Sequence, residues 1–349
     1  QAEGKEANPA PKEPHLSQKS IRYERAKEIT TPDGFINTLG KPISIRDLIG
    51  KKVVLLDIWT YSCINCQRTT PYLNSWWQKY KDKGLVIVGL HTPEFEFEKK
   101  YENVLAAVKK FGIEYPVVLD NDYSIWRAYR NQYWPRKYLI DIDGFIVYDH
   151  IGEGAYEETE REIQKALSER MQRLDEKGSV DVAVTKEQTV PRAGSPEIYF
   201  GASRNEYLAN GAQGRTGLQS LTLPESRSLN RLYLGGEWDM EPEYAENQNA
   251  GAVIEFRYKA KEVYLVASAE KGVRVKIFND GALVKGNGES SSDCRLKGFC
   301  GGEDVSADGS VLIREDRLYK LIQNDGVEEH LLKIEIEEPG LKAFTFTFG

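Results

Sequence analysis

In the first half of the chain, continuous hydrophobic runs take turns with segments in which hydrophobic residues recur at helical spacing. Two continuous apolar runs rich in β-branched residues, KKVVLLDIW at residues 51–59 and LVIVGLHT at 85–92, predict strands buried on both faces. Each run is followed by a segment with helical periodicity that ends in glycine, at residues 69–84 and 94–112. This succession predicts a domain in which strands and helices alternate.

The end of this domain has a different arrangement. After a further short strand and a short helix, residues 137–152 alternate between apolar and polar around Asp143-Gly144, a pattern typical of an antiparallel hairpin. Residues 157–174 then predict a closing helix with charge pairs on an exposed face. We therefore predict an α/β fold over residues 26–174, with a mixed central sheet flanked by helices.

The second half of the chain is rich in short β-type runs. They are RLYLGGEW, AVIEFRY, EVYLVAS, VRVKIF, SVLIRE, LYKLIQ, HLLKIEI and AFTFTFG. The turn sequences Asn279-Asp280-Gly281, Asp308-Gly309 and Asn324-Asp325-Gly326 separate several of them. Such spacing without a helical stretch predicts an all-β jelly roll or sandwich over residues 195–349. Residues 175–194 form the predicted linker, in which Val180 to Val184 is a candidate short strand.

Composition narrows the function classes. The net charge is −7, with acidic and basic residues interleaved, which argues against a nucleic-acid-binding surface. No apolar run approaches the ~20 residues that span a bilayer. Residues 1–25 contain few large apolar side chains at their start and predict a flexible tail. A cleaved signal, a preceding membrane segment or a truncation by cloning would each explain a start at Gln1 instead of Met.

The candidate chemistry lies in LLDIWTYSCINCQRTTPYL, residues 55–73. A buried strand that runs directly into a helix places Cys63 at the helix start, where unpaired N–H groups and the helix dipole stabilise a thiolate. Cys66 lies one turn further along and is placed to resolve a mixed disulfide formed by Cys63. Arg68 adds positive charge nearby, and Pro71 either kinks the helix or marks its first turn.

Asp57 is the unusual residue of the preceding strand, because its neighbours are apolar. A carboxylate buried there is costly unless it has a partner, so we expect its pKa to be raised. Asp57 is a candidate base for deprotonating Cys66, and a hydrogen-bonded structural Asp at a strand end is the alternative.

These motifs resemble the extracytoplasmic thioredoxin-like reductases of the TlpA/ResA kind. The resemblance rests on the strand Asp, Trp59 four residues before the first cysteine, the CxxC motif and the helix proline, and on YWPRKYLIDIDG, which resembles the family's cis-proline segment. The stretch from HTPEFEFEKKY to YWPRKYLID, together with SPEIYFGASRNEY and AFTFTFG, resembles the DipZ-type proteins. In those proteins a CcdA/DsbD-like membrane domain precedes a thioredoxin-like domain and a β-rich module. The resemblance covers residues 26–349.

The resemblance implies roles for several residues. Cys63 would be the exposed nucleophile and Cys66 the resolving thiol. Pro135 would be a cis proline that presents the neighbouring backbone to an extended substrate. The aromatic residues expected to line the substrate groove are Trp59, Tyr61 and Trp134. The acidic residue that many relatives carry three positions after the second cysteine is Thr69 here, and the intervening pair Ile64-Asn65 has neither Pro nor charge.

Other residues carry weaker signals. Glu94, near His91 after the second buried strand, is either an accessory residue of the site or a favourable charge at a helix start. Cys294 and Cys300 flank a Gly/Ser-rich loop and predict a structural disulfide, with a second redox pair as the alternative. We expect no metal site, because the cysteine pairs lie in different domains and the four histidines are scattered.

The second domain is similar to the carbohydrate-binding-module-like domain of DipZ-type proteins. Sugar binding needs exposed aromatic rings with polar neighbours. The candidates in the β-type runs and beside them are Tyr233, Trp238 and Tyr244, with Glu237 and Asp239. Protein docking or a scaffold role is the alternative for this domain.

Our main hypothesis is an extracytoplasmic thiol–disulfide oxidoreductase that reduces substrate disulfides through Cys63 and Cys66 without a further cofactor. We expect a periplasmic or cell-envelope location, with the N-terminus as a candidate membrane tether. The expected partners are a CcdA/DsbD-like membrane electron donor and disulfide-bearing extracytoplasmic proteins. The alternatives are a thiol peroxidase and a glycan- or protein-binding protein with a redox-inert first domain.

Overall fold

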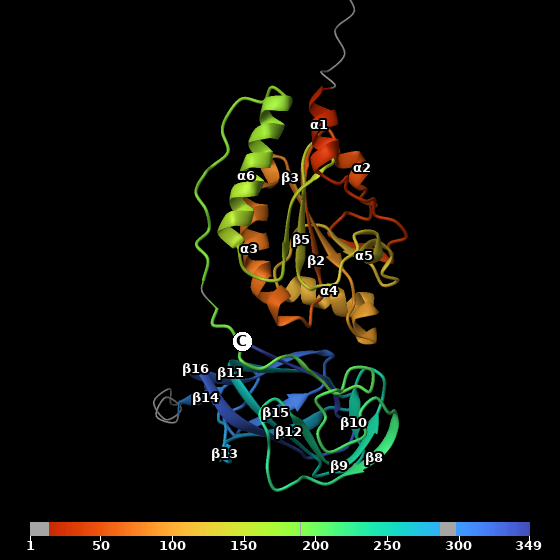
Figure 1. The fold of residues 1–349 in the computed structure, drawn as a ribbon, viewed down its shortest axis with the longest axis vertical. Helices are drawn as coiled ribbons and strands as arrows, with labels where there is room; N and C mark the ends of the chain where they lie inside the picture. The colour runs from red at the N-terminus through yellow and green to blue at the C-terminus, as the bar shows by residue number, and fades with distance from the viewer. Residues whose placement is uncertain (1–13, 189, 287–297) are drawn as a thin grey trace, which may run out of the picture. The chain divides into compact units, whose positions relative to one another are not determined.

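The computed structural model describes residues 14–188, 190–286 and 298–349. The chain forms two compact units that divide near Glu187 (Figure 1). Among the helices of these described ranges, none has the length and apolar character required to cross a membrane.

Six strands form the central sheet of the first unit, in the order β1-β4-β3-β2-β5-β6. They are β1 (Gly34–Ile36), β2 (Val53–Trp59), β3 (Leu85–His91), β4 (Val117–Leu119), β5 (Arg136–Ile140) and β6 (Ile146–Ile151). β2, β3 and β4 are parallel, whereas β1, β5 and β6 run antiparallel to their neighbours. The predicted mixed sheet is therefore confirmed, and β1 is an addition that its three residues did not reveal.

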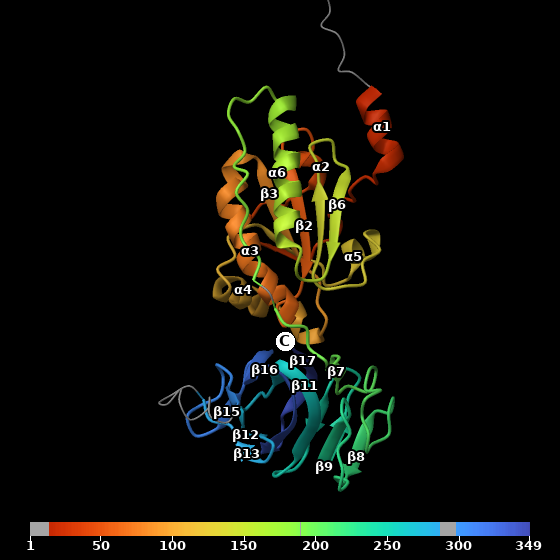
Figure 2. The ribbon, with the colours of Figure 1, turned by 60° about the vertical axis from the view of Figure 1, so that its left-hand side comes forward.

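Helices cover both faces of this sheet. They are α1 (Pro14–Arg22), α2 (Ile45–Leu48), α3 (Ile64–Tyr80), α4 (Tyr101–Lys110), α5 (Ser124–Ala128) and α6 (Tyr156–Arg173), with the 3₁₀ turns η1 (Lys81–Lys83) and η2 (Glu96–Lys99). In Figures 1 and 2, α3 and α6 lie side by side on one face of the sheet, and α2 and α5 lie on the other. This arrangement is the predicted α/β fold.

Strand β2 is buried along its whole length because it lies between helices on both faces. Val54, Leu56 and Ile58 pack into the core that includes residues of α2 and α5. Side chains alternate along a strand, so Asp57 points to the opposite face, which α3 and α6 cover. The fold thus directs the one charged residue of β2 toward the helix that carries the cysteines.

The chain after α6 packs back onto the first unit. Residues 181–187, here termed the return segment, run back alongside α6 in Figure 1. Lys79 Nζ and Gln164 Nε2 both donate to the carbonyl oxygen of Ala183, at 3.0 and 3.1 Å. The candidate strand from Val180 to Val184 does not form, since these hydrogen bonds come from helix side chains instead of a neighbouring strand.

The second unit is built from antiparallel strands, so the predicted all-β class is confirmed. They are β7 (Ile198–Tyr199), β8 (Gly217–Leu221), β9 (Leu232–Met240), β10 (Ala245–Asn247), β11 (Val253–Ser268), β12 (Val273–Asn279), β13 (Ala282–Leu283), β14 (Phe299–Gly301), β15 (Ser310–Ile313), β16 (Arg317–Ile336) and β17 (Lys342–Phe348). Hydrogen-bonded strands follow one another across the sheet in the order β13-β12-β16-β11-β17-β10-β9-β8. Its apolar side chains form a separate core.

Two pairs of predicted strands are each a single long strand. AVIEFRY and EVYLVAS together form β11, which has 16 residues, and LYKLIQ and HLLKIEI together form β16, which has 20. The prediction that Asn324-Asp325-Gly326 is a turn between two strands is wrong. Ala260 pairs with Glu328 and Glu262 pairs with Gln323, so the extra residues of β16 are accommodated as a bulge in a continuing ladder.

Candidate active site

The two cysteines lie where β2 passes into α3. Cys63 immediately precedes the first residue of α3 and is partly exposed, whereas Cys66 lies in the first turn and is buried. The structure holds both residues as thiols. A partly exposed sulfur at a helix N-terminus, backed by a buried one, is an arrangement suited to thiol–disulfide exchange.

Side chains of α3 fix this turn. Gln67 Nε2 donates to the carbonyl oxygen of Tyr61 at 2.8 Å, which ties the loop before Cys63 to the helix. Thr70 Oγ1 donates to the carbonyl oxygen of Cys66 at 3.0 Å. Pro71 lies inside α3, beyond the first turn.

Asp57 is buried, as predicted, and has a partner that sequence reasoning missed. Lys137 of β5 pairs directly with Asp57 of β2, and its side chain is also fully buried. Burial raises the pKa of Asp57 to about 6, and the positive charge of Lys137 opposes this shift. The expected rise is thus confirmed. The signal is the position of Lys137 in its strand. Residues directly opposite each other on adjacent strands lie on the same face of the sheet, so a lysine opposite buried Asp57 is buried as well.

Thr69 occupies the position at which the resemblance implies an acidic residue. It is buried, its Oγ1 donates to the carbonyl oxygen of Asn65 at 2.8 Å, and it shares a 3.1 Å hydrogen bond with the hydroxyl of Tyr156. Arg68 approaches Glu153 at 3.5 Å, so its charge is directed toward the loop between β6 and α6. A threonine hydroxyl cannot serve as the acid or base, so Asp57 remains the candidate for proton transfer.

Trp59 and Tyr61 do not line an open groove, which corrects the prediction. The side chain of Trp59 is only 2% exposed and packs edge-on against His91, with ring centroids 5.1 Å apart. Tyr61 is also buried and stacks on the same imidazole at 5.8 Å. Burial lowers the pKa of His91 to about 3, so this ring is a neutral packing element. Trp59 lies inward because it shares with Asp57 the face of β2 that α3 and α6 cover.

The Trp134–Pro135 peptide bond is cis, as the resemblance implied. Pro135 is buried and immediately precedes β5, whereas Trp134 is partly exposed. The indole Nε1 of Trp134 donates to the carbonyl oxygen of Thr92 at 2.9 Å, and its ring lies 4.3 Å from that of Trp126. Trp134 is therefore held in place by these two contacts.

Glu94 lies in the segment between β3 and η2 and is partly exposed. The residue that closes the start of η2 is Glu98, whose buried carboxylate accepts hydrogen bonds from the backbone N–H groups of Glu94 and Phe95 at 2.7 and 3.1 Å. The favourable negative charge at this helix start, which the sequence suggested for Glu94, is therefore supplied by Glu98.

The structure describes one cysteine of the second predicted pair. Cys300 of β14 is disulfide-bonded. Cys294 lies outside the described residues, so its role stays a prediction.

The aromatic candidates for sugar binding are mostly internal. Trp238 is fully buried, with its indole donating to the carbonyl oxygen of Gly235 at 3.1 Å, and Tyr233 is 6% exposed. Only Tyr244 of the three is partly exposed, with Lys342 Nζ 5.2 Å from its ring centre. The glycan-binding prediction is wrong for Trp238 and Tyr233, because neither ring presents a face to solvent on which a sugar could stack.

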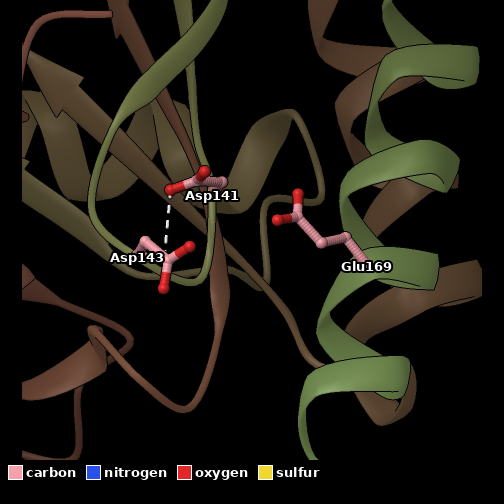
Figure 3. Close-up of side chains that lie close together, drawn as sticks. All are labelled: Asp141, Asp143 and Glu169. Carbon is pink, nitrogen blue, oxygen red and sulfur yellow. Dashed lines mark hydrogen bonds between the residues drawn. The ribbon is translucent and has the colours of Figure 1, made fainter. Parts of the chain in front are cut away.

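Three carboxylates converge at another part of the first unit. Asp141 and Asp143 follow β5, and Glu169 projects toward them from α6 (Figure 3). Lys19 of α1 occupies the space between them, with its Nζ at 2.5, 2.9 and 2.5 Å from Asp141, Asp143 and Glu169. Although burial opposes the change, these hydrogen bonds raise the pKa of Lys19. The cluster anchors α1 through an ammonium group, so Pro14–Arg22 form an anchored helix where the sequence predicted part of a flexible tail.

Comparison with known proteins gives matches over both units. The family model described as Redoxin matches residues 24–167, and the one described as Thioredoxin like C-terminal domain matches residues 195–349. Protein DipZ of Mycobacterium bovis is 40% identical over 248 residues, covering 68% of this chain and 35% of DipZ. Thiol-disulfide oxidoreductase ResA of Bacillus cereus is 36% identical over 126 residues, covering 36% of this chain and 69% of ResA. The chain spans about a third of the length of DipZ.

The mixed sheet and the cysteine pair at its strand–helix junction have the architecture of the thioredoxin-like thiol–disulfide oxidoreductases. The chain belongs to the ResA-like family of these enzymes, and its relatives include the DipZ proteins.

Proposed function

We propose that the protein reduces disulfide bonds of proteins outside the cytoplasm, with Cys63 as nucleophile and Cys66 as resolving thiol. One observation carries the proposal: the sulfur next to the helix start is partly exposed and its CxxC partner is buried. This difference in access favours attack on a protein disulfide by Cys63 and leaves Cys66 for the internal step.

The proposed reaction has two exchange steps. The Cys63 thiolate attacks one sulfur of the substrate disulfide, which forms a mixed disulfide and releases the other substrate sulfur as a thiolate. Cys66 loses its proton to Asp57 and attacks Cys63, which forms the Cys63–Cys66 disulfide and releases the second substrate thiolate. The substrate gains two electrons, the protein loses two, and the released thiolates take protons from water.

Residues around the cysteines supply the substrate contact in this proposal. Pro135 and Trp134 present the backbone before β5 to an extended substrate segment. The fixed indole of Trp134 supports this role, since a held aromatic ring loses little entropy when a substrate packs on it. Glu94 is an accessory residue after the end of β3 in the same proposal.

Renewed activity requires a dithiol reductant. We propose a CcdA/DsbD-like membrane donor that exchanges with the Cys63–Cys66 disulfide and returns two electrons, so the protein itself needs no further cofactor. The 40% identity with Protein DipZ over 248 residues supports a cell-envelope location and this type of donor.

The proposal is tested by reduction of insulin disulfides with dithiothreitol as the reductant. The wild-type protein is expected to accelerate insulin precipitation, and Cys63→Ser is expected to abolish the acceleration. Cys66→Ser should instead accumulate a mixed disulfide with insulin that is seen by non-reducing electrophoresis. Equal rates with and without the wild-type protein would overturn the proposal.

A further inference from the structure

Three neighbouring strands carry a row of ionisable residues beneath α3 and α6. Lys137 of β5 pairs with Asp57 of β2 on one side and with His150 of β6 on the other. Directly opposed residues of adjacent strands lie on the same sheet face, with Cβ atoms roughly 5 Å apart. The row therefore lies on the face that the cysteine-bearing helix covers.

Lys137 is the lysine of this row, and it is fully buried. Its side chain has no exposed surface, and its Nζ donates to the carbonyl oxygen of Gly152 at 3.2 Å. The same Nζ lies 5.6 Å from the ring centre of Tyr156 at the start of α6. A buried ammonium group is costly, so its retention at this position calls for a negative charge nearby.

Cys66 and this ammonium group interact electrostatically, and side chains of α3 and α6 lie between their elements. Thr69, one turn after Cys66, hydrogen-bonds the hydroxyl of Tyr156, whose ring faces Lys137. Burial lowers the pKa of Lys137, and negative charge on Asp57 and on Cys66 opposes that lowering. Burial also raises the pKa of Tyr115, and the same two negative charges add to that rise, which places Asp57 and Cys66 in one electrostatic environment.

We propose that Lys137 is a positioning residue of the redox site, whose buried charge stabilises the Cys66 thiolate and keeps Asp57 ready to accept the Cys66 proton. The inference rests on the proposed function. In the resolving step the proton passes from Cys66 to Asp57, and the negative charge that develops on the buried sulfur is compensated by Lys137. The new Cys63–Cys66 bond then forms as the substrate thiolate leaves.

Several other ionisable groups surround Lys137 and belong in any pH-dependent test. They are Asp57 of β2, Cys66 of α3, His150 of β6, Glu153 after β6, Tyr156 of α6 and Glu187 of the return segment. His150 pairs directly with Lys137 across the strands, so it needs its own variant.

The experiment measures the resolving step in a single turnover. The reduced full chain is mixed with an excess of a peptide disulfide, quenched with acid at intervals, and analysed by mass spectrometry for the mixed disulfide between pH 5 and 9. Lys137→Met keeps the length of the side chain without its charge. Lys165→Met, on the exposed side of α6, is the matched control, and His150→Gln tests the neighbouring imidazole.

We expect Lys137→Met to slow resolution about tenfold at pH 7 and to move the midpoint of its pH profile upward, because Asp57 loses the charge that favours its ionised form. Formation of the mixed disulfide should change little. Lys165→Met should match the wild type, and His150→Gln should leave the midpoint in place. An unchanged midpoint and rate in Lys137→Met would overturn the inference, whereas a wild-type protein that forms no mixed disulfide would overturn the proposed function instead.

A measurement on the wild-type protein removes dependence on the folding of that variant. The ¹³Cε resonance of Lys137 is followed against pH in the reduced and the oxidised protein. Its titration midpoint is expected to be lower in the oxidised form, where Cys66 carries no charge. Identical midpoints in the two forms would contradict the coupling, whether or not the protein reduces substrates.

Discussion

At the scale of single residues, Asp57 illustrates how a functional group affects stability. Its carboxyl group has an ordinary pKa of 3.8 and a pKa of about 6 in the folded protein, chiefly because of burial. The folded state therefore binds more protons than the unfolded state between these values, and stability falls as the pH rises from about 4 to 6. Above that range the ionised, buried carboxylate destabilises the fold by roughly 3 kcal/mol.

Asp57→Asn is accordingly expected to stabilise the protein by about 1–3 kcal/mol at pH 8, while slowing disulfide resolution, since the base is lost. Lys137 loses its partner in this variant, which keeps the gain below the full value. Urea unfolding of reduced wild type and variant at pH 8 and pH 4 measures the difference. An equal difference at both pH values would show that ionisation of Asp57 is not its cause.

The residues of the site differ in how far the sequence could predict them. Cys63, Cys66 and Asp57 were predictable because each departs from the local pattern in a way that chemistry explains. Lys137 was not, since a lysine at the start of a strand is usually exposed, and its burial depends on β5 pairing with β2. The inward position of Trp59 likewise follows from the sheet face it occupies.

At the scale of elements, the return segment is held by α3 and α6 through a buried carboxylate. Glu160 of α6 has no exposed surface and accepts hydrogen bonds from Lys79 Nζ, Tyr80 Oη and the backbone N–H of Thr185, at 2.6, 2.8 and 2.6 Å. Burial alone would raise the pKa of Glu160, but these donors hold it below its ordinary value. The segment is thus integrated with the first unit.

Glu160→Gln is expected to reduce the free energy of unfolding of the first unit by about 1–3 kcal/mol at pH 7, because charge-assisted hydrogen bonds to a buried group are replaced by weaker ones. Glu157→Gln on the exposed side of α6 is the control, with little effect expected. Urea unfolding followed by circular dichroism provides the comparison. Equal stabilities of the two variants would contradict the anchoring role.

The sequence predicted the type of most elements but missed two kinds of detail. Turn sequences within β16 suggested an end where the strand continues, since a bulge and a turn both favour Asn, Asp and Gly. The course of the return segment was also missed. Its path depends on side chains of α3 and α6 that are distant in sequence.

At the scale of the whole molecule, each unit has its own apolar core. The first is centred on β2 and β3, and the second on β9, β11, β16 and β17. The second core is built from described residues of the second unit, so we expect it to form without the thioredoxin-like part.

We therefore predict that residues 195–349, expressed alone, fold with a cooperative thermal transition and a blue-shifted fluorescence from buried Trp238. Without the cysteine pair of α3, this fragment should not accelerate insulin reduction. A fragment that shows no cooperative transition under oxidising conditions would contradict the independence of the two cores.

The most direct test of the account concerns the different access of the two cysteines. The native, reduced protein is treated with a limiting amount of iodoacetamide, and the modified residue is identified by mass spectrometry of peptides. The account predicts that Cys63 is alkylated first and that Cys66 reacts at the same rate only after unfolding in urea. Equal labelling of both cysteines in the native protein, or earlier labelling of Cys66, would contradict the assignment of nucleophile and resolving thiol.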